Sequence, residues 1–472
     1  MKNILKWNAE FAKNIWLEFS PQRLIAMPAI IMLVVALIFS SSSSPANAWN
    51  TIHYAALAGF VIVGLLWGIK MASDAILDEY NEKTWDWQKM SIIGARKLAF
   101  GKLFGSTLYN WYGAILCWIL FMISTGYSNY PENQFKVGIL LIISMIALHG
   151  IMILITLQMV RKADGRAKIK SNRVFIFGIF FLVFISRFFT PWIPHSGYPM
   201  NLNWYFIPMN STDRTMLSAL FYCAWIIAGL YRSMRAELQF SDTPVWWVLF
   251  LISNFFFQYG FFINSPAFHG THGLAYCFAI VFSETLFILY FLSLSESKDI
   301  VNFRLLLNAL KEKKYRSFFQ NVPLWITTLP IAFMFGLFAF IFFAVSPTNN
   351  NYTDALLSPM SLFNFNILFS KTQAFCFFIA VMGFVIRDLG ILLLLNFSTR
   401  SKRADTAMVV YLILLYIVLP LLTKDLGIGL FFYPDITSNS FSMLIFPLVE
   451  AALVLFLVAK RWKEMYEAKA VA

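Results

Sequence analysis

The chain has 472 residues, of which 59% are hydrophobic and 18% aromatic but only 13% charged, and its mean hydropathy is +0.67. A water-exposed globular protein carries about a quarter of its residues as charged types, so this composition excludes a soluble protein and predicts a surface that largely faces lipid. The net charge of +13 does not indicate nucleic-acid binding, because the basic residues lie in short loops between apolar runs, where they set orientation in a membrane. We therefore expect the lipid bilayer as a partner and no nucleic acid.

Residues 2–19 have the periodicity of an amphipathic helix that lies in the membrane interface and does not span it. The apolar residues of this segment fall on one arc of the helix: Ile4, Trp7, Phe11, Ile15 and Phe19. Its charged residues fall on the opposite arc: Lys2, Lys6, Glu10 and Lys13.

The rest of the chain holds a series of apolar runs about as long as a membrane span, which takes roughly 20 residues. Backbone in contact with lipid must satisfy its own hydrogen bonds, so these runs are predicted to be helices. The sequence predicts an all-α polytopic membrane protein with about twelve spans, at residues 24–39, 54–73, 104–124, 137–160, 174–190, 215–231, 245–263, 273–293, 322–346, 373–395, 406–423 and 441–459.

The distribution of Lys and Arg predicts the orientation of these spans. With a cytoplasmic N-terminus, thirty of the 37 basic residues fall in the inside segments and four in the outside loops. This asymmetry is typical of cytoplasmic loops. We expect a multi-pass protein of the cytoplasmic (inner) membrane with both termini in the cytoplasm.

A weak internal repeat predicts two tandem six-span halves, 1–231 and 232–472. Leu17-Glu18-Phe19-Ser20 and Leu238-Gln239-Phe240-Ser241 precede the first span of each half at an offset of 221. The second and third spans of each half are joined by the two most substantial inside loops, 74–103 and 294–321, and Asp78 falls on Asp299 in this register.

The loop between the second and third spans carries a distinctive pattern, DEYNEKTWDWQKMSIIGARKLAFGKLFG at 78–105. Acids and a pair of tryptophans come first, a turn-like break follows at Ile93-Gly94-Ala95, and Gly101-Lys102 opens the next span. In this order of elements the loop resembles the cytoplasmic coupling helix of membrane subunits of type-2 ABC exporters, whose usual proline in the break is replaced here by Ile-Ile-Gly. The loop at 294–321 has a helical pattern without the Thr-Trp signature.

This resemblance implies a permease in which one chain supplies two fused halves. It places the coupling to a separate cytoplasmic ATPase, expected as a pair of subunits, on Asp78, Glu79, Glu82, Thr84, Trp85 and Trp87. It also implies that the outside loops 191–214 and 424–440 correspond to the re-entrant helices of the family. The open alternative is that 74–103 is a loop helix on anionic lipid, although its acids would be repelled there.

The chain itself shows no ATP-binding motif. Around Gly101-Lys102 the P-loop pattern fails, because position 96 is Arg and position 103 is Leu. ATP and Mg²⁺ are therefore expected only on the partner ATPase, with no cofactor bound by this chain.

Ionisable residues within spans are costly and are candidate functional groups. Those near the middle of a predicted span are Glu284, Glu450, Arg387, Asp388 and His149. Arg387 and Asp388 are adjacent, so we expect them not to face each other and to find separate partners on other spans. Interhelical hydrogen bonding, packing of the histidine and a place on a translocation path all remain open.

Cysteines and histidines predict neither a disulfide nor a metal site. Cys117, Cys223, Cys277 and Cys376 each lie within an apolar run and are expected to be buried. The function expected from the sequence is a non-enzymatic permease subunit of an ATP-driven exporter. The alternatives are an ion-coupled secondary transporter that uses Glu284, Glu450, Arg387 and Asp388, and a lipid-modifying membrane enzyme or structural subunit.

Overall fold

The structure is a computed structural model that describes most of the chain. The described residues are 7–127, 131–163, 168–169, 202–240, 243–263, 271–296, 298, 300–345, 371–397, 404–422 and 441–468. The predicted span 174–190 and the loop 424–440 lie outside them, as does Asp299. The chain divides into two compact units, unit 1 (Met1–Leu202 and Ile207–Asp242) and unit 2 (Asn203–Phe206 and Thr243–Ala472).

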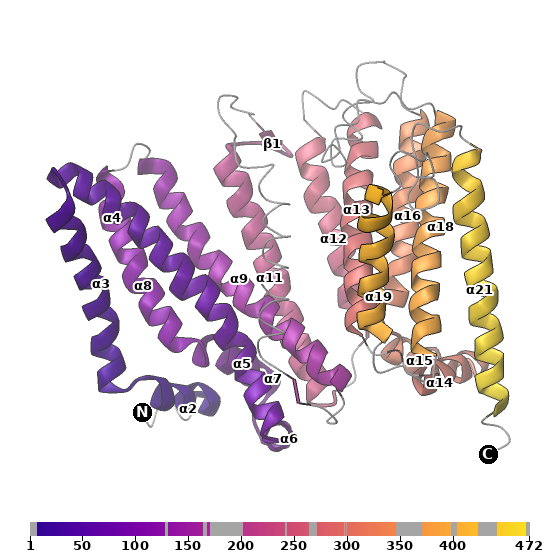
Figure 1. The fold of residues 1–472 in the computed structure, drawn as a ribbon, viewed down its shortest axis with the longest axis horizontal. Coiled ribbons are helices and arrows are strands. Elements are labelled where there is room, and N and C mark those ends of the chain that lie inside the picture. The colour runs from indigo at the N-terminus through magenta and orange to yellow at the C-terminus, as the bar shows by residue number, and fades with distance from the viewer. Residues whose placement is uncertain are drawn as a thin grey trace. The chain divides into compact units, whose positions relative to one another are not determined.

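Unit 1 is built almost wholly of helices (Figure 1). Its elements are α2 (Ala9–Glu18), α3 (Pro21–Ser41), α4 (Pro45–Phe60), η1 (Val61–Trp67), α5 (Gly68–Asn81), α6 (Trp85–Lys89), α7 (Ala95–Phe100), η2 (Gly101–Gly105), α8 (Leu108–Ser124), η3 (Thr125–Tyr127), α9 (Pro131–Ala163), β2 (Ile207–Met209) and α11 (Ser211–Glu237). The strand β1 (Leu202–Trp204) runs across the boundary of the two units. Within the predicted outside loop 191–214, residues 202–209 thus form two short strands and a turn, not a helix.

Unit 2 is also helical. Its elements are α12 (Val245–Phe262), α13 (Thr271–Ser295), α14 (Ile300–Lys311), α15 (Tyr315–Asn321), α16 (Leu324–Val345), α18 (Lys371–Asn396), α19 (Ala404–Ile413), η7 (Leu414–Val418), α20 (Leu419–Leu422) and α21 (Ser442–Ala468). In Figure 1 the short helices α14 and α15 lie crosswise at one end of the long helices of this unit.

The long helices confirm a multi-pass membrane protein. Among the described residues, ten helices are long and apolar enough to span a bilayer, and an eleventh span is formed if the pair Ala95–Gly105 and Leu108–Ser124, bent by 54°, crosses as one. These eleven segments coincide with eleven of the predicted spans. The total of twelve, the orientation and the likeness of the two halves stay predictions.

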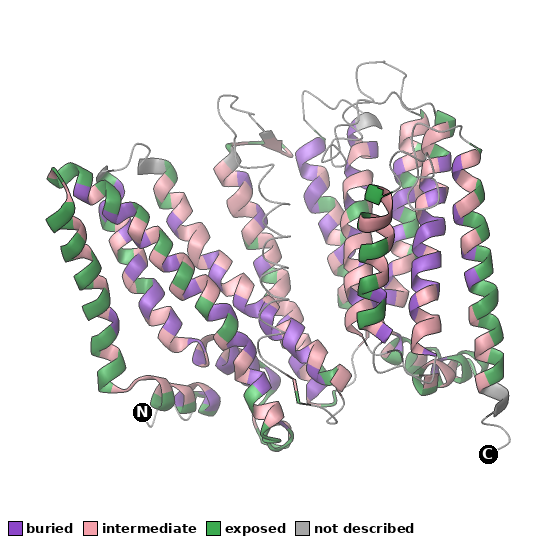
Figure 2. Cartoon of the chain, in the orientation of Figure 1, coloured by how far each residue is buried: buried purple, intermediate pink, exposed green. Residues whose placement is uncertain are grey.

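Local sequence explains how several of these helices start. Ser20 and Ser44 each cap a helix whose first residue is proline, and each hydroxyl accepts a hydrogen bond from a backbone N–H of the first turn. The long runs between such caps expose apolar side chains widely, as Figure 2 shows for α3 and α21. Exposure of this kind is expected where the solvent is lipid.

Small residues and cysteines fill the contacts between helices within each unit. In unit 1, Phe60, Ala114, Cys117 and Met145 form one buried cluster. All four cysteines are buried and free, which confirms the predicted burial. They act as small apolar residues in the helix contacts.

The amphipathic N-terminal helix is present, but one of its charged residues is buried. The structure gives α2 as Ala9–Glu18, too short to span a bilayer. Glu10, which was assigned to the polar outer arc, is only 3% exposed, whereas Trp16 and Leu17 are exposed. The reason is an ion pair with a lysine far along the chain, which a helical wheel of residues 2–19 does not contain.

Candidate functional site

The segment Thr84–Gly94, here called the docking segment, follows the end of α5 through a tight turn. Thr84 N donates to Glu79 O at 2.8 Å and Lys83 N to Tyr80 O at 3.1 Å, and Lys83 has φ of 62°. This pair of bonds is a Schellman motif with a left-handed residue at its centre. The turn ends α5 and redirects the chain into α6, which in unit 1 lies beyond the ends of the long helices (Figure 1).

A group of charges around the buried Glu10 and Lys102, the basal ion cluster, fixes the root of the docking segment. It consists of Glu10, Lys13, Glu79 and Lys102. Lys102 Nζ lies 3.0 Å from Glu10 Oε1 and also pairs with Glu79, and Lys13 Nζ pairs with Glu79 Oε1 at 2.9 Å. Gln88 of α6 donates to Glu10 Oε2 at 2.7 Å. The cluster therefore ties α2, α5, α6 and η2 together.

Electrostatics favours the charged state of this cluster. Burial alone would raise the pKa of Glu10, but the Lys102 and Lys13 ammonium groups outweigh it and hold that pKa below its usual 4.5. Burial alone would lower the pKa of Lys13, but Glu10 and Glu79 raise it above 10.5. Because Lys102 is only 2% exposed, loss of Glu10 or Glu79 would leave its buried ammonium group with too few anionic partners.

Two glycines allow α2 to approach this closely. A Cβ on Gly101 would lie 2.7 Å from a Glu10 side-chain carbon, and one on Gly105 would lie 2.8 Å from the Asn14 amide. Phe100 packs edge-on against the Trp7 ring at a centroid distance of 4.9 Å. The predicted pair Gly101-Lys102 therefore supplies both the space and the cation for the contact with α2.

A second brace links α6 to two long helices of unit 1. Lys89 Nζ lies 3.8 Å from Glu237 Oε2 at the end of α11, and Glu237 Oε1 pairs with Arg161 near the end of α9. Asn8 also donates to Lys97 O at 2.8 Å, which joins the cap of α2 to α7. The docking segment is thus held at its root from several sides.

The outer side of the docking segment is apolar and exposed. Trp87 and Met90 are 75% and 74% exposed, and Ile92 is fully exposed. The residues Asp78–Lys89 around this side carry four acids against two lysines. Three large exposed apolar side chains on such a short segment are typical of a protein-binding surface.

The six predicted coupling residues fall into two groups. Trp85 is buried, with Lys102 Nζ 5.9 Å from its ring centroid, and Glu79 belongs to the basal ion cluster. The others are exposed: Asp78, Glu82, Thr84 and Trp87. The sequence did not predict that Glu10, Lys13 and Gln88 anchor this segment, because no local pattern indicates such long-range contacts. It also did not predict the exposure of Met90 and Ile92.

Unit 2 contains the same turn. Lys314 N donates to Ala309 O at 2.8 Å and Lys313 N to Leu310 O at 3.1 Å, and Lys313 has φ of 57°. The sequences of the two turns also match, Glu82-Lys83-Thr84-Trp85 and Glu312-Lys313-Lys314-Tyr315, at an offset of 230. The register of 221, which paired Asp78 with Asp299, does not bring these turns together.

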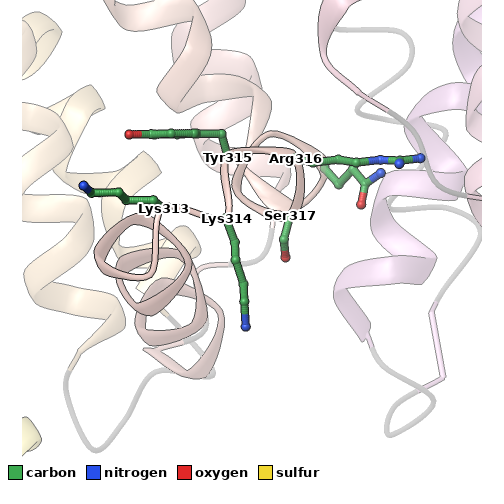
Figure 3. A pocket seen from close by; sticks show the side chains of 6 residues that line it. Lys313, Lys314, Tyr315, Arg316 and Ser317 are labelled. Carbon is green, nitrogen blue, oxygen red and sulfur yellow. The ribbon is translucent and has the colours of Figure 1, made fainter.

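The helices that flank this second turn, α14 and α15, are here called the basic hairpin. Its turn carries Lys311, Lys313, Lys314 and Arg316 against the single acid Glu312. An open hollow there is lined by residues 313–317 and Gln320. Figure 3 shows the Lys313, Lys314 and Arg316 side chains pointing in three different directions, so they do not converge on one small ligand.

Within the long helices of unit 2, three of the predicted intramembrane residues, Arg387, Asp388 and Glu450, form one network. Arg387 pairs with Asp388 Oδ1 at 2.9 Å and with Glu450 Oε2 at 2.6 Å. The hydroxyls of Tyr290 and Tyr416 donate to Asp388 Oδ2 at 2.8 and 2.6 Å. The prediction that Arg387 and Asp388 do not face each other is wrong, because the long arginine side chain folds back onto its neighbour.

Glu284 has a different setting. Asn254 Nδ2 donates to its Oε2 at 2.8 Å and Gln258 Nε2 to its Oε1 at 3.1 Å. Among the described residues of unit 2, no lysine or arginine forms an ion pair with Glu284. Neutral amides from α12 thus solvate this carboxyl group.

His149 packs against the second span of unit 1. Its Nε2 lies 2.9 Å from Gly64 O, and a Cβ on Gly68 would overlap the imidazole ring. The ring is fully buried. This position is that of a packing histidine in a close helix contact.

In the parts of the chain that the structure describes, no group of His, Cys, Asp and Glu could hold a metal ion. Comparison with protein-family models, with curated proteins and with solved structures gave no match for this chain. The geometry of the docking segment is therefore the main ground for a functional proposal.

Proposed function

We propose that the chain is the permease subunit of an ATP-driven exporter and that the docking segment binds a separate cytoplasmic nucleotide-hydrolysing protein. The observation that carries the proposal is the exposed apolar group of Trp87, Met90 and Ile92 on a projection whose root is fixed by buried ion pairs. Its resemblance to the coupling helix of type-2 ABC exporters supports the same function.

Charge favours a protein over lipid as the occupant of this surface. Asp78 of α5, Glu82 of the turn and Asp86 of α6 are exposed, and anionic headgroups repel such acids. A binding groove on a protein accepts an aromatic anchor with an acidic rim, and large side chains of this kind contribute most of the affinity of an interface.

The anchoring of the segment fits a lever that transmits motion. Force on α6 would pass through Gln88 and the basal ion cluster to α2 and α5, and through Lys89 and Glu237 to α11 and α9. Directional contacts of this kind move helices as rigid bodies, as expected for elements with discrete arrangements. Nucleotide binding and Mg²⁺ remain with the partner, since this chain lacks a P-loop pattern.

Co-purification tests the proposal. The full chain, extracted gently from its native membrane, is expected to bring down a protein that contains a P-loop and hydrolyses ATP. Trp87→Ala should reduce that recovery at least tenfold, whereas the matched variant Phe319→Ala, which is also exposed, should leave it unchanged. Recovery of the wild-type chain without a nucleotide-binding protein would overturn the proposal.

The setting of Glu284 favours ion-coupled transport as a second candidate. A carboxyl group in a span with amide partners and no cation in its described surroundings is suited to taking up and releasing a proton. In vesicles that contain this chain alone, a proton gradient should then drive substrate movement, and Glu284→Gln should abolish it. Transport that requires ATP and a second protein would rule this candidate out.

A further inference from the structure

We infer that the basic hairpin of unit 2 binds the headgroups of anionic phospholipids at the cytoplasmic face of the membrane. This inference does not depend on the proposed ATPase partner. It rests on the orientation predicted from the basic residues and on three observations: the charge of the turn, the exposed apolar residues beside it and its attachment to the unit.

The charge of the turn complements an anionic surface. Four basic residues and one acid lie between Lys311 and Arg316, and all are exposed. Both side chains of the ion pair of Lys314 with Glu312 at 2.7 Å are largely exposed, 67% and 57%, so the pair is weak and leaves the turn basic. Since the cations point in different directions (Figure 3), they suit several headgroups in a plane better than one buried phosphate.

Exposed apolar side chains accompany these cations. Val301, Leu305 and Leu310 of α14 are 49%, 60% and 47% exposed, and Tyr315 and Phe319 of α15 are similarly open. A short helix that combines such residues with lysine and arginine is typical of elements that lie in the membrane interface. The docking segment of unit 1 carries one acid, Asp86, and one lysine, Lys89, and lacks this cluster of cations, so the same argument does not extend to it.

The base of the hairpin is attached to the membrane-spanning helices of its own unit. Arg304 donates to Met465 O at 2.7 Å, Leu306 is buried, and the rings of Phe303 and Trp325 meet at 6.4 Å. These contacts hold α14 crosswise at the ends of the long helices of unit 2 (Figure 1). The turn and α15 thus lie at one end of the apolar helices, at the level where headgroups are found.

Photoactivatable lipids test the inference. The purified full chain is reconstituted in phosphatidylcholine vesicles that contain one-third phosphatidylglycerol, with a photoactivatable tracer of either lipid, and cross-linked peptides from 300–322 are quantified by mass spectrometry. At low salt the phosphatidylglycerol tracer should be enriched at least roughly fivefold over phosphatidylcholine. The enrichment should fall as NaCl is raised to about 0.5 M, because salt screens exposed charges.

Variants identify the residues responsible. The combined change Lys313→Gln, Lys314→Gln and Arg316→Gln should abolish the enrichment, and the control Lys460→Gln, an exposed lysine of α21, should preserve it. All three substituted side chains are exposed, so the variant should fold as the wild type does. Equal labelling by both lipids in the wild type, or enrichment that survives the triple substitution, would overturn the inference.

Discussion

The docking segment of unit 1 and the basic hairpin of unit 2 contain the same turn but differ in charge. Both turns place a lysine in the left-handed conformation after a helix, with the same pair of backbone hydrogen bonds. Beyond the turn, unit 1 exposes Trp87 beside the single acid Asp86, whereas unit 2 exposes Tyr315 and Phe319 beside Lys314 and Arg316. The comparison shows that a shared backbone motif positions a segment, while its side chains decide what it contacts.

The roots of the two segments also differ. The docking segment rests on the basal ion cluster, in which two carboxylates converge on Lys102. The basic hairpin is held mainly by Leu306, Phe303 and the bond from Arg304 to Met465 O. Charged, directional contacts are suited to transmitting force, and apolar contacts to holding a helix at an interface.

The largest effect is expected from Lys102→Met. Removal of the cation leaves Glu10 and Glu79 buried together, which should destabilise unit 1 by about 3–5 kcal/mol and release α2. Thermal unfolding in detergent, with hydrogen exchange of residues 9–18, would measure this. The matched variant Lys298→Met removes a buried lysine that pairs with Asp405 in unit 2, and it should leave exchange in α2 unchanged.

A smaller effect, confined to binding, is expected from Trp87→Ala. This side chain contacts little of its own chain, so stability should change by less than about 0.5 kcal/mol. Affinity for the co-purified ATPase should fall by about 2 kcal/mol or more, roughly thirtyfold. Thermal unfolding measures the stability, and titration of the purified partner onto the reconstituted chain measures the affinity. An unchanged affinity would show that Trp87 does not bind the ATPase, and the proposed difference between the docking segment and the basic hairpin would then be wrong.

The basal ion cluster also predicts the pH range in which α2 stays packed against η2. The pKa of Glu10 is lowered in the folded chain, so its contribution is complete above 4.5 and is lost as pH falls through the lower folded value. The pKa of Lys13 is raised, so its contribution is complete below 10.5 and is lost above it. The distance between spin labels at Leu17→Cys and Lys97→Cys should stay constant between these two pH values and increase in acid. The distance between labels on α14 and α21 should not increase in acid.

The smallest effect should be the same in both units. Lys83→Gly and Lys313→Gly each place glycine, which adopts the left-handed conformation without strain, at the centre of the turn. Each should stabilise its unit by about 0.5 kcal/mol. Thermal unfolding of the two variants is the measurement. A destabilisation in one unit alone would show that the turns are not equivalent.

The sequence predicted the elements of the fold better than the contacts between them. Apolar length located the spans, and the aromatic and acidic pattern at 78–87 located the projecting segment. The burial of Glu10 was missed because its partner Lys102 is distant in sequence, and the pairing of Arg387 with Asp388 because spacing along a helix ignores the reach of a side chain. The repeated Glu-Lys-x-aromatic turn was readable from sequence, but the register of 221 obscured it.

Photo-cross-linking from position 87 in native membranes tests the central claim most directly. A photoreactive amino acid at Trp87 should capture a protein with a P-loop, in a yield that changes when ATP is trapped, while the same group at Leu305 should capture lipid. Capture of lipid alone from position 87 would contradict the account, because the docking segment would then be an interfacial element like the basic hairpin.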